Sequence, residues 1–202
     1  MEITKIEVHV VGPEDERYTW SEDIEEVYQS NTIIRIFTDE DIVGEAAVWN
    51  ATYFEYDKYT AESLRHLLPI LIGKDPLNRE EILYEIRPRV FPQPPGAQAL
   101  IDNALWDILG KKCKAPIYKI LGGRRNKIKS YASTLMYDTI DEYLKVVSEM
   151  IDEGFSAVKF HTYCIPKKDL ELAEAARKAF PSMSFMIDAE NNYDLEYNKY
   201  ET

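Results

Sequence analysis

Hydrophobic and polar residues alternate along the first part of the chain with the period of β-strands. Ile3 to Val11 shows this alternation, and Thr32 to Phe37 and Val43 to Trp49 show it on either side of the acidic turn 39–41. A period of two places alternate side chains on one face of a sheet. The pattern predicts a short antiparallel sheet, interrupted from Gly12 to Ser30 by a long polar, acidic and aromatic loop that is either a lid or solvated decoration.

From Thr60 the period becomes helical. One side of the first predicted helix carries four leucines: Leu64, Leu67, Leu68 and Leu71. A second helix is predicted to start at Asn78, which has the capping-box spacing to Glu81, and to stop at Pro88. A third, longer helix has apolar residues at i, i+3, i+4 and i+7, which predicts a wide buried face. Its members are Ala97, Leu100, Ile101, Ala104, Leu105 and Ile108.

Strands and helices alternate in the last part of the chain. A strand from Ile128 to Thr134 precedes a helix whose start, Thr139 and Glu142, has capping-box spacing. The pattern then predicts a strand, a helix and a strand: Ala157 to His161, Lys167 to Phe180 and Ser184 to Asp188. This order is typical of parallel βαβ units.

Two domains follow from these patterns. We predict an α+β domain over residues 1–127 and an α/β domain over residues 128–202. The second domain has room for three strands, whereas a closed (β/α)8 barrel takes about 250 residues. The expectation is therefore the first three βα units of an incomplete TIM-type barrel, truncated after the third strand.

Composition narrows the function. The 202 residues are 45% hydrophobic and 30% charged, which is typical of a folded globular protein, and the formal charge is -12. Such a charge repels nucleic acid and anionic membranes. No apolar run approaches the roughly 18 residues of a membrane span, and the N-terminus has no secretion signal, so we predict a cytoplasmic protein. Cys113 and Cys164 lack CxxC spacing and are expected to be reduced thiols.

Three polar residues near predicted strand ends are candidates for chemistry. Lys159 and His161 share one face of their strand, while Val158 and Phe160 would pack against helices on the other. Asp188 ends the next strand, where the active sites of parallel α/β barrels lie, and is a candidate ligand for a hard cation. Each also has a plain interpretation, as a solvated or hydrogen-bonded side chain or a turn residue.

Several motifs, taken together, resemble the enolase superfamily and, within it, the mandelate racemase and muconate lactonizing enzyme family. They are Ile3–Val8, Val43–Ala46, Ala104–Lys111, and Pro116 with Leu121–Gly123. The order also fits. An α+β capping domain comes first, Val158–His161 then stands where the family has Lys-x-Lys, and Met186–Ala189 stands where it has its first metal-binding aspartate.

The resemblance implies abstraction of the proton beside a carboxylate, with Mg2+ holding the enediolate that forms. Asp188 would be one of three carboxylate metal ligands, and Lys159 would help neutralise a small-molecule carboxylate substrate. His161 takes the place of the second lysine and is either a base or a substrate hydrogen-bonding group, since imidazole titrates near neutral pH. Glu190 stands where the family commonly has asparagine, so substrate preference cannot be transferred.

The resemblance also implies that two capping-domain stretches close over the barrel mouth. They are Tyr18 to Val27 and Asn50 to Tyr56. Trp20, Tyr53 and Phe54 are the candidate substrate contacts, and ordinary domain packing is the alternative for each.

We expect the N-terminal portion of an acid-sugar or hydroxy-acid dehydratase or racemase, with dehydration favoured and a homo-oligomeric assembly. His161 argues against lactonizing enzymes, o-succinylbenzoate synthases and dipeptide epimerases, which generally carry Lys-x-Lys. The other two metal ligands and the opposite acid or base would come after Thr202, so the isolated 202 residues are predicted to be inactive. The competing hypothesis is a truncated, non-catalytic structural or binding protein that associates through its open barrel edge.

Overall fold

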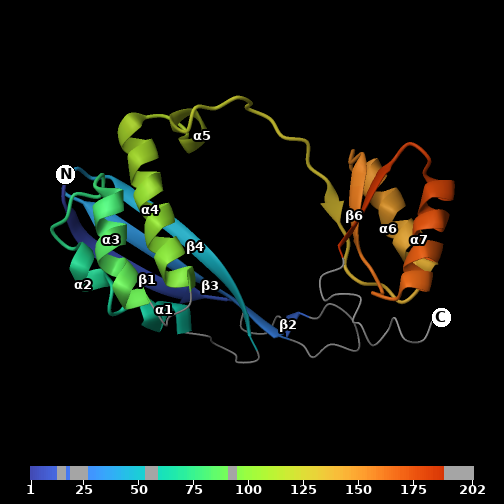
Figure 1. Ribbon diagram of the computed structural model, residues 1–202, viewed down its shortest axis with the longest axis horizontal. Helices are drawn as coiled ribbons and strands as arrows, with labels where there is room; N and C mark the ends of the chain where they lie inside the picture. The colour runs from blue at the N-terminus through green and yellow to red at the C-terminus, as the bar shows by residue number, and fades with distance from the viewer. Residues whose placement is uncertain (13–16, 19–26, 53–58, 91–94, 189–202) are drawn as a thin grey trace. The chain divides into compact units, whose positions relative to one another are not determined.

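The computed structural model describes residues 1–12, 17–18, 27–52, 59–90 and 95–188 (Figure 1). The chain divides into two compact units: the first comprises Met1–Tyr18 and Glu26–Asn126, and the second comprises Thr19–Glu25 and Lys127–Thr202. The first unit contains β1 (Ile3–Val11), β2 (Arg17–Tyr18), β3 (Val27–Thr38), β4 (Val43–Thr52), α1 (Tyr59–Leu64), α2 (Leu68–Leu71), α3 (Arg79–Val90), α4 (Pro95–Cys113) and α5 (Ile117–Ile120). The second contains β5 (Ala132–Ser133), α6 (Ile140–Asp152), β6 (Ala157–His161), α7 (Pro166–Ala179) and β7 (Ser184–Asp188).

An antiparallel sheet forms the first unit, as the alternating pattern predicts. The long strand β3 lies between β1 and β4 and also pairs with β2. Ile34 faces Val8 on one side and Ala46 on the other. Ile34 and Ile36 are fully buried, while Arg35 between them lies on the opposite face. One face of the sheet is therefore apolar and the other polar.

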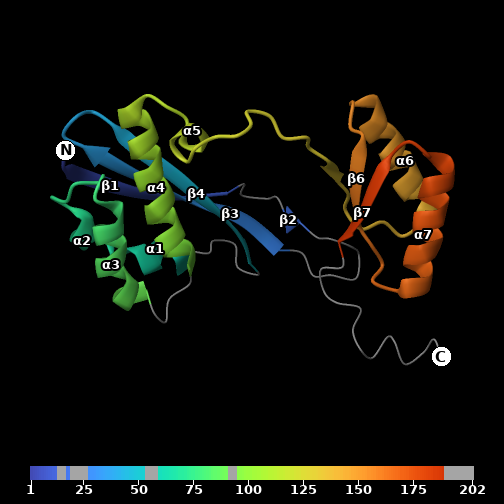
Figure 2. The ribbon, with the colours of Figure 1, turned by 45° about the horizontal axis from the view of Figure 1, so that its top comes forward.

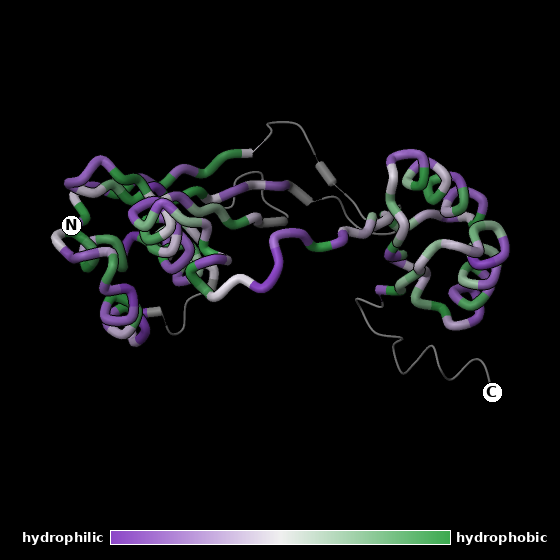
Figure 3. The backbone as a smooth tube through the Cα atoms, turned by 90° about the horizontal axis from the view of Figure 1, so that it is seen from above, coloured by the Kyte–Doolittle hydropathy of each residue, from purple (hydrophilic) through white to green (hydrophobic). Residues whose placement is uncertain are grey.

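Helices cover the apolar face of this sheet (Figure 2). The six apolar positions predicted for the long helix α4 are all buried in the core. Figure 3 shows apolar and polar stretches alternating along the helices of each unit, the pattern of half-buried helices. No helix in the described ranges is long and apolar enough to cross a membrane.

Three predictions for the first unit were wrong in detail. The helix predicted from Thr60 is divided into α1 and α2, because Pro69 stands in the first turn of α2 and cannot donate a backbone hydrogen bond across the break. Pro88 does not stop α3, which runs to Val90, since a proline in the last turn removes only one helical bond. The stretch Gly12–Ser30 is not one loop, because β2 and the start of β3 pair within it.

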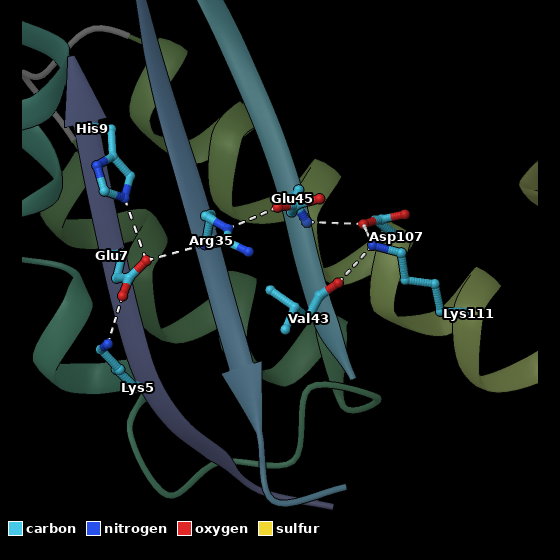
Figure 4. A network of polar contacts seen from close by, with 8 residues as sticks. All are labelled: Lys5, Glu7, His9, Arg35, Val43, Glu45, Asp107 and Lys111. Carbon is cyan, nitrogen blue, oxygen red and sulfur yellow. Dashed lines mark hydrogen bonds and ion pairs between the residues drawn. The ribbon is translucent and has the colours of Figure 1, made fainter. Parts of the chain in front are cut away.

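Side chains of α4 bind the outer edge of β4 (Figure 4). The backbone N–H of Glu45 donates to Asp107 Oδ2 at 2.9 Å, and Lys111 Nζ donates to the carbonyl of Val43 at 2.7 Å. Asp107 and Lys111 also pair with each other at 2.7 Å. The N–H of Glu45 and the carbonyl of Val43, which have no described strand beside them at this edge, thereby gain hydrogen-bond partners. Between them, Gly44 allows close approach, since a Cβ there would lie 2.2 Å from the carbonyl oxygen of Ala104.

The polar face carries a second network. Arg35 Nε donates to Glu45 Oε1 at 2.8 Å, and its Nη1 lies 3.4 Å from Glu7 Oε2 (Figure 4). Lys5 and His9 flank the same glutamate from β1. These contacts lower the pKa of Glu7, chiefly through the hydrogen bond from Lys5. The exposed ion pairs contribute little to stability singly, and they keep this face polar.

A parallel sheet in the order β5-β6-β7 forms the second unit, with α6 and α7 packed against it. Thr139 heads α6 with the predicted capping box, accepting from Glu142 N while Glu142 accepts from the Thr139 backbone. The predicted strand from Ile128 to Thr134 is shorter in the structure, where β5 is the only strand within that described range. The described residues show the predicted alternation of strands and helices.

Candidate functional site

The neighbouring strands β6 and β7 position the polar residues that the sequence singled out. In their parallel register His161 is opposite Asp188. Val158 and Phe160 are buried in the core on the other face, where Phe160 stacks on Phe185 with ring centroids 5.3 Å apart. Because side chains alternate along a strand, this packing turns Lys159 and His161 to the face opposite the helices.

Lys159, His161 and Asp188 meet on that face. Lys159 Nζ lies 2.5 Å from Asp188 Oδ2, and His161 Nε2 lies 3.8 Å from the same oxygen. The hydrogen bond from Lys159 lowers the pKa of Asp188 below its ordinary value, and the charges of Lys159 and His161 act in the same direction. The aspartate is therefore a carboxylate at neutral pH, next to one fixed cation and one titratable ring.

Backbone and side-chain contacts fix His161 from two neighbouring segments. Its amide donates to Thr134 Oγ1 at 3.1 Å, and its ring Nδ1 lies 2.5 Å from the carbonyl oxygen of Thr134. The hydroxyl of Tyr143 on α6 donates to the carbonyl of His161 at 2.5 Å and accepts from Tyr137 N at 3.1 Å. Burial raises the pKa of Tyr143 to about 12, so the phenol keeps its proton and remains a donor.

Sequence reasoning singled out the three residues of this face and missed Thr134 and Tyr143. Thr134 gave one usable signal, since it is the last residue of a predicted strand and the ends of neighbouring parallel strands adjoin. Tyr143 lies within an amphipathic helix, where an aromatic residue indicates core packing. Its hydroxyl contact became evident only from the structure.

The described residues supply part of a metal site. No group of three or more His, Cys, Asp or Glu side chains in the described ranges is arranged to hold a metal ion. Asp188 offers one carboxylate, the ligand type that Mg2+ prefers. It fits such a site as a single ligand.

The remaining sequence-predicted positions cannot be placed. Trp20, Tyr53 and Phe54 lie outside the described residues, and so does Glu190.

Comparison with known proteins identifies relatives along nearly the whole chain. The family model for the mandelate racemase / muconate lactonizing enzyme N-terminal domain matches residues 6–122. An o-succinylbenzoate synthase from Listeria innocua serovar 6a is 30% identical over 175 residues, which are 81% of this chain and 44% of the relative. Other relatives include racemases, dehydratases and a cycloisomerase.

Solved structures agree with this assignment. A Pseudovibrio sp. protein assigned to the mandelate racemase/muconate lactonizing enzymes is 37% identical, with a TM-score of 0.86 over 96% of this chain and 53% of that one. A dipeptide epimerase from Enterococcus faecalis V583, complexed with Mg and the dipeptide L-Leu-L-Tyr, is 25% identical, with a TM-score of 0.78 over 94% and 54%. The chain spans about half the length of the relatives it matches.

Proposed function

Because the chain belongs to the mandelate racemase/muconate lactonizing enzyme family of the enolase superfamily, we propose that it forms the capping domain and the first part of the active site of an enzyme that abstracts the proton beside a carboxylate. Residues 128–202 are, in this proposal, the first three βα units of a (β/α)8 barrel. The single observation that carries the proposal is the meeting of Lys159, His161 and Asp188 on one face at the strand ends.

The proposed role of Lys159 is to stabilise the negative charge that develops on the substrate carboxylate. Removing the proton beside a carboxylate places further negative charge on the carboxylate oxygens, and a fixed cation stabilises that charge most where water is largely excluded. The side chain of Lys159 is 21% exposed and is held by Asp188. Its ammonium group is the proposed contact for one oxygen of the substrate carboxylate.

Asp188 is the proposed first ligand of Mg2+. Its carboxylate is 28% exposed and ionised, so it can be reached by a hard cation. When bound, Mg2+ supplies Lewis-acid stabilisation of the enediolate oxygens. The chain itself contributes the orientation of this carboxylate, which the contact with Lys159 fixes.

His161 is the proposed proton-transfer residue. Its ring is 8% exposed, and Nε2 points toward Asp188 on the same face as Lys159. An imidazole can accept a proton from carbon and return one to a leaving hydroxyl, which supports dehydration of a hydroxy acid or acid sugar. Racemisation remains the second reaction of this class that the site supports, and relatives of this chain include both racemases and dehydratases.

The whole protein is needed for turnover in this proposal. The described residues hold one candidate carboxylate ligand, and Mg2+ takes near-octahedral oxygen coordination. We therefore expect the 202 residues by themselves to be inactive. The proposed active form is a cytoplasmic homo-oligomer whose partner is a small carboxylate.

Two experiments test the function. The intact mass of the natively expressed protein distinguishes the 23.5 kDa of this chain from a value about twice as large, expected if a complete barrel is present. Protein of the larger mass is then assayed with Mg2+ on a panel of acid sugars, hydroxy acids and N-acyl amino acids. Mg2+-dependent loss of water or epimerisation supports the proposal, whereas turnover by the 202 residues alone would overturn the predicted inactivity.

A further inference from the structure

Thr134 contacts the end of β6 through all three of its backbone and side-chain polar groups. Its N–H donates to the carbonyl of Lys159 at 3.0 Å, its hydroxyl accepts from the amide of His161 at 3.1 Å, and its carbonyl lies 2.5 Å from His161 Nδ1. One residue just beyond β5 thus binds both site residues of the neighbouring strand.

The hydroxyl of Thr134 accepts a hydrogen bond that a backbone carbonyl normally accepts in a parallel sheet. In a regular parallel ladder, a residue whose N–H binds Lys159 would receive the amide of His161 on its own carbonyl. Here the hydroxyl receives that amide, and the carbonyl meets the imidazole instead. The threonine side chain therefore makes the carbonyl available to the ring.

A carbonyl oxygen can only accept a hydrogen bond, so its ring partner must donate. We infer that Thr134 is a positioning residue, which fixes His161 in the tautomer that carries its proton on Nδ1 and directs Nε2 toward Asp188. The hydrogen bond at one ring nitrogen determines the tautomer, so Nε2 is the nitrogen left to face Asp188. The consequence for catalysis rests on the proposed function; the tautomer does not.

Burial makes this arrangement specific. Thr134 is 2% exposed and His161 is 7% exposed, so water competes little for either group. Rotating the ring would leave a buried carbonyl without its ring donor, which is costly because water cannot replace that donor. The hydroxyl of Tyr143 on α6 binds the carbonyl of His161, so the backbone at the end of β6 is held in place while the ring is positioned by Thr134.

The experiment is 15N NMR of the chain labelled at histidine, recorded at about pH 8, above the ordinary titration range of imidazole. The chain has 3 histidines, and the spectrum of the His161→Gln variant identifies the signals of His161. The inference predicts one dominant tautomer with the proton on Nδ1. A proton on Nε2, or on both nitrogens, would overturn it.

Two variants test the role of the hydroxyl. Thr134→Val replaces it with a methyl group of similar size, so the His161 amide returns to the carbonyl and competes with the ring. A second tautomer should then become detectable, while Thr134→Ser keeps the wild-type spectrum. A Thr134→Val spectrum identical to wild type would show that the hydroxyl does not position the ring. Because the NMR measurement involves no substrate, the expected tautomer in a complete enzyme that turns over no acid of the panel would count against the proposed function alone, whereas a different tautomer would count against this inference alone.

Discussion

Lys159 and Asp188 meet across two adjacent parallel strands, with Nζ 2.5 Å from Oδ2. They are 29 residues apart in the sequence and become neighbours because β6 and β7 pair in register. This contact keeps Asp188 ionised and holds the ammonium of Lys159 at the strand ends. A cation and a carboxylate, the two groups to which the proposed function assigns the substrate and the metal ion, therefore lie side by side.

Replacing Lys159 with methionine should reduce turnover by about 100-fold or more in the complete enzyme, because one fixed donor to the developing negative charge is lost. Steady-state kinetics with the best substrate of the panel measures the effect. Lys168→Met is the matched control, since Lys168 is an exposed lysine of the same unit that lies over the ring of Tyr163 at 5.2 Å. Equal effects of the two substitutions would contradict the role of Lys159.

Tyr143→Phe should destabilise the second unit by about 2 kcal/mol, because two backbone groups lose a partner. They are the carbonyl of His161 and the N–H of Tyr137. Urea denaturation at neutral pH measures the loss. A change below about 0.5 kcal/mol would show that these hydrogen bonds do not stabilise the fold.

The same residue should make the chain sensitive to alkali. Burial raises the pKa of Tyr143 to about 12, so between about pH 10 and 12 the unfolded state loses the phenol proton while the folded state keeps it. The unfolded state binds fewer protons there, and stability falls as pH rises, by up to about 1.4 kcal/mol per pH unit. The stability difference between wild type and Tyr143→Phe should narrow over this window, and a constant difference would contradict the account.

The edge contacts of β4 should contribute measurably to stability. Lys111→Ala removes the donor to the Val43 carbonyl and to Asp107, and should cost about 1 kcal/mol. Lys112→Ala removes only an exposed pair with Glu40 and should cost less than about 0.5 kcal/mol. Thermal denaturation of both variants measures the two losses of stability. Equal losses would mean that the hydrogen bond from Lys111 to the Val43 carbonyl does not stabilise the first unit.

Gly44 should not tolerate a side chain. A Cβ at this position would meet the Ala104 carbonyl at 2.2 Å and Ile108 Cγ1 at 2.6 Å, so α4 would have to move away from β4. We expect Gly44→Ala to destabilise the first unit by about 3 kcal/mol. Gly96→Ala is the control, since its Cβ would meet nothing closer than 3.7 Å and stability should change by less than about 1 kcal/mol.

The contacts of Lys111 and Gly44 explain two of the motifs by which the sequence resembles its family. The block Ala104–Lys111 contains the buried residues of α4 together with Asp107 and Lys111, which bind the edge of β4. The glycine of Val43–Ala46 allows that helix to approach. Two motifs that are far apart in the sequence therefore form a single packing contact between α4 and β4, which neither motif shows by itself.

Elements with strong local signals were predicted well from the sequence. The period-two strands, the capping box of Thr139 and the apolar stripe of α4 depend on neighbouring residues, so their pattern is visible in the chain. The division at Pro69 and the continuation of α3 past Pro88 depend on where a proline falls within a helical turn, and the pattern did not resolve this.

The candidate site was predicted only in part for a related reason. Strand alternation placed Lys159 and His161 on one face, and the strand end indicated Asp188. The contacts of Thr134 and Tyr143 with His161 join residues 27 and 18 positions away. The Thr134 hydroxyl takes the place of a ladder carbonyl, and the Tyr143 hydroxyl donates to the carbonyl of His161. These contacts depend on tertiary geometry, which hydrophobic periodicity does not describe.

The most direct test of the central claim is exchange of the proton beside the substrate carboxylate with solvent deuterium. The complete enzyme is incubated in D2O with Mg2+ and a panel of acid sugars, hydroxy acids and N-acyl amino acids, and incorporation is followed by NMR and mass spectrometry. The account predicts Mg2+-dependent incorporation by wild type and by Lys168→Met, and loss of at least about 100-fold of the rate in Asp188→Asn. Exchange that persists in Asp188→Asn, or no exchange with any acid of the panel, would contradict it.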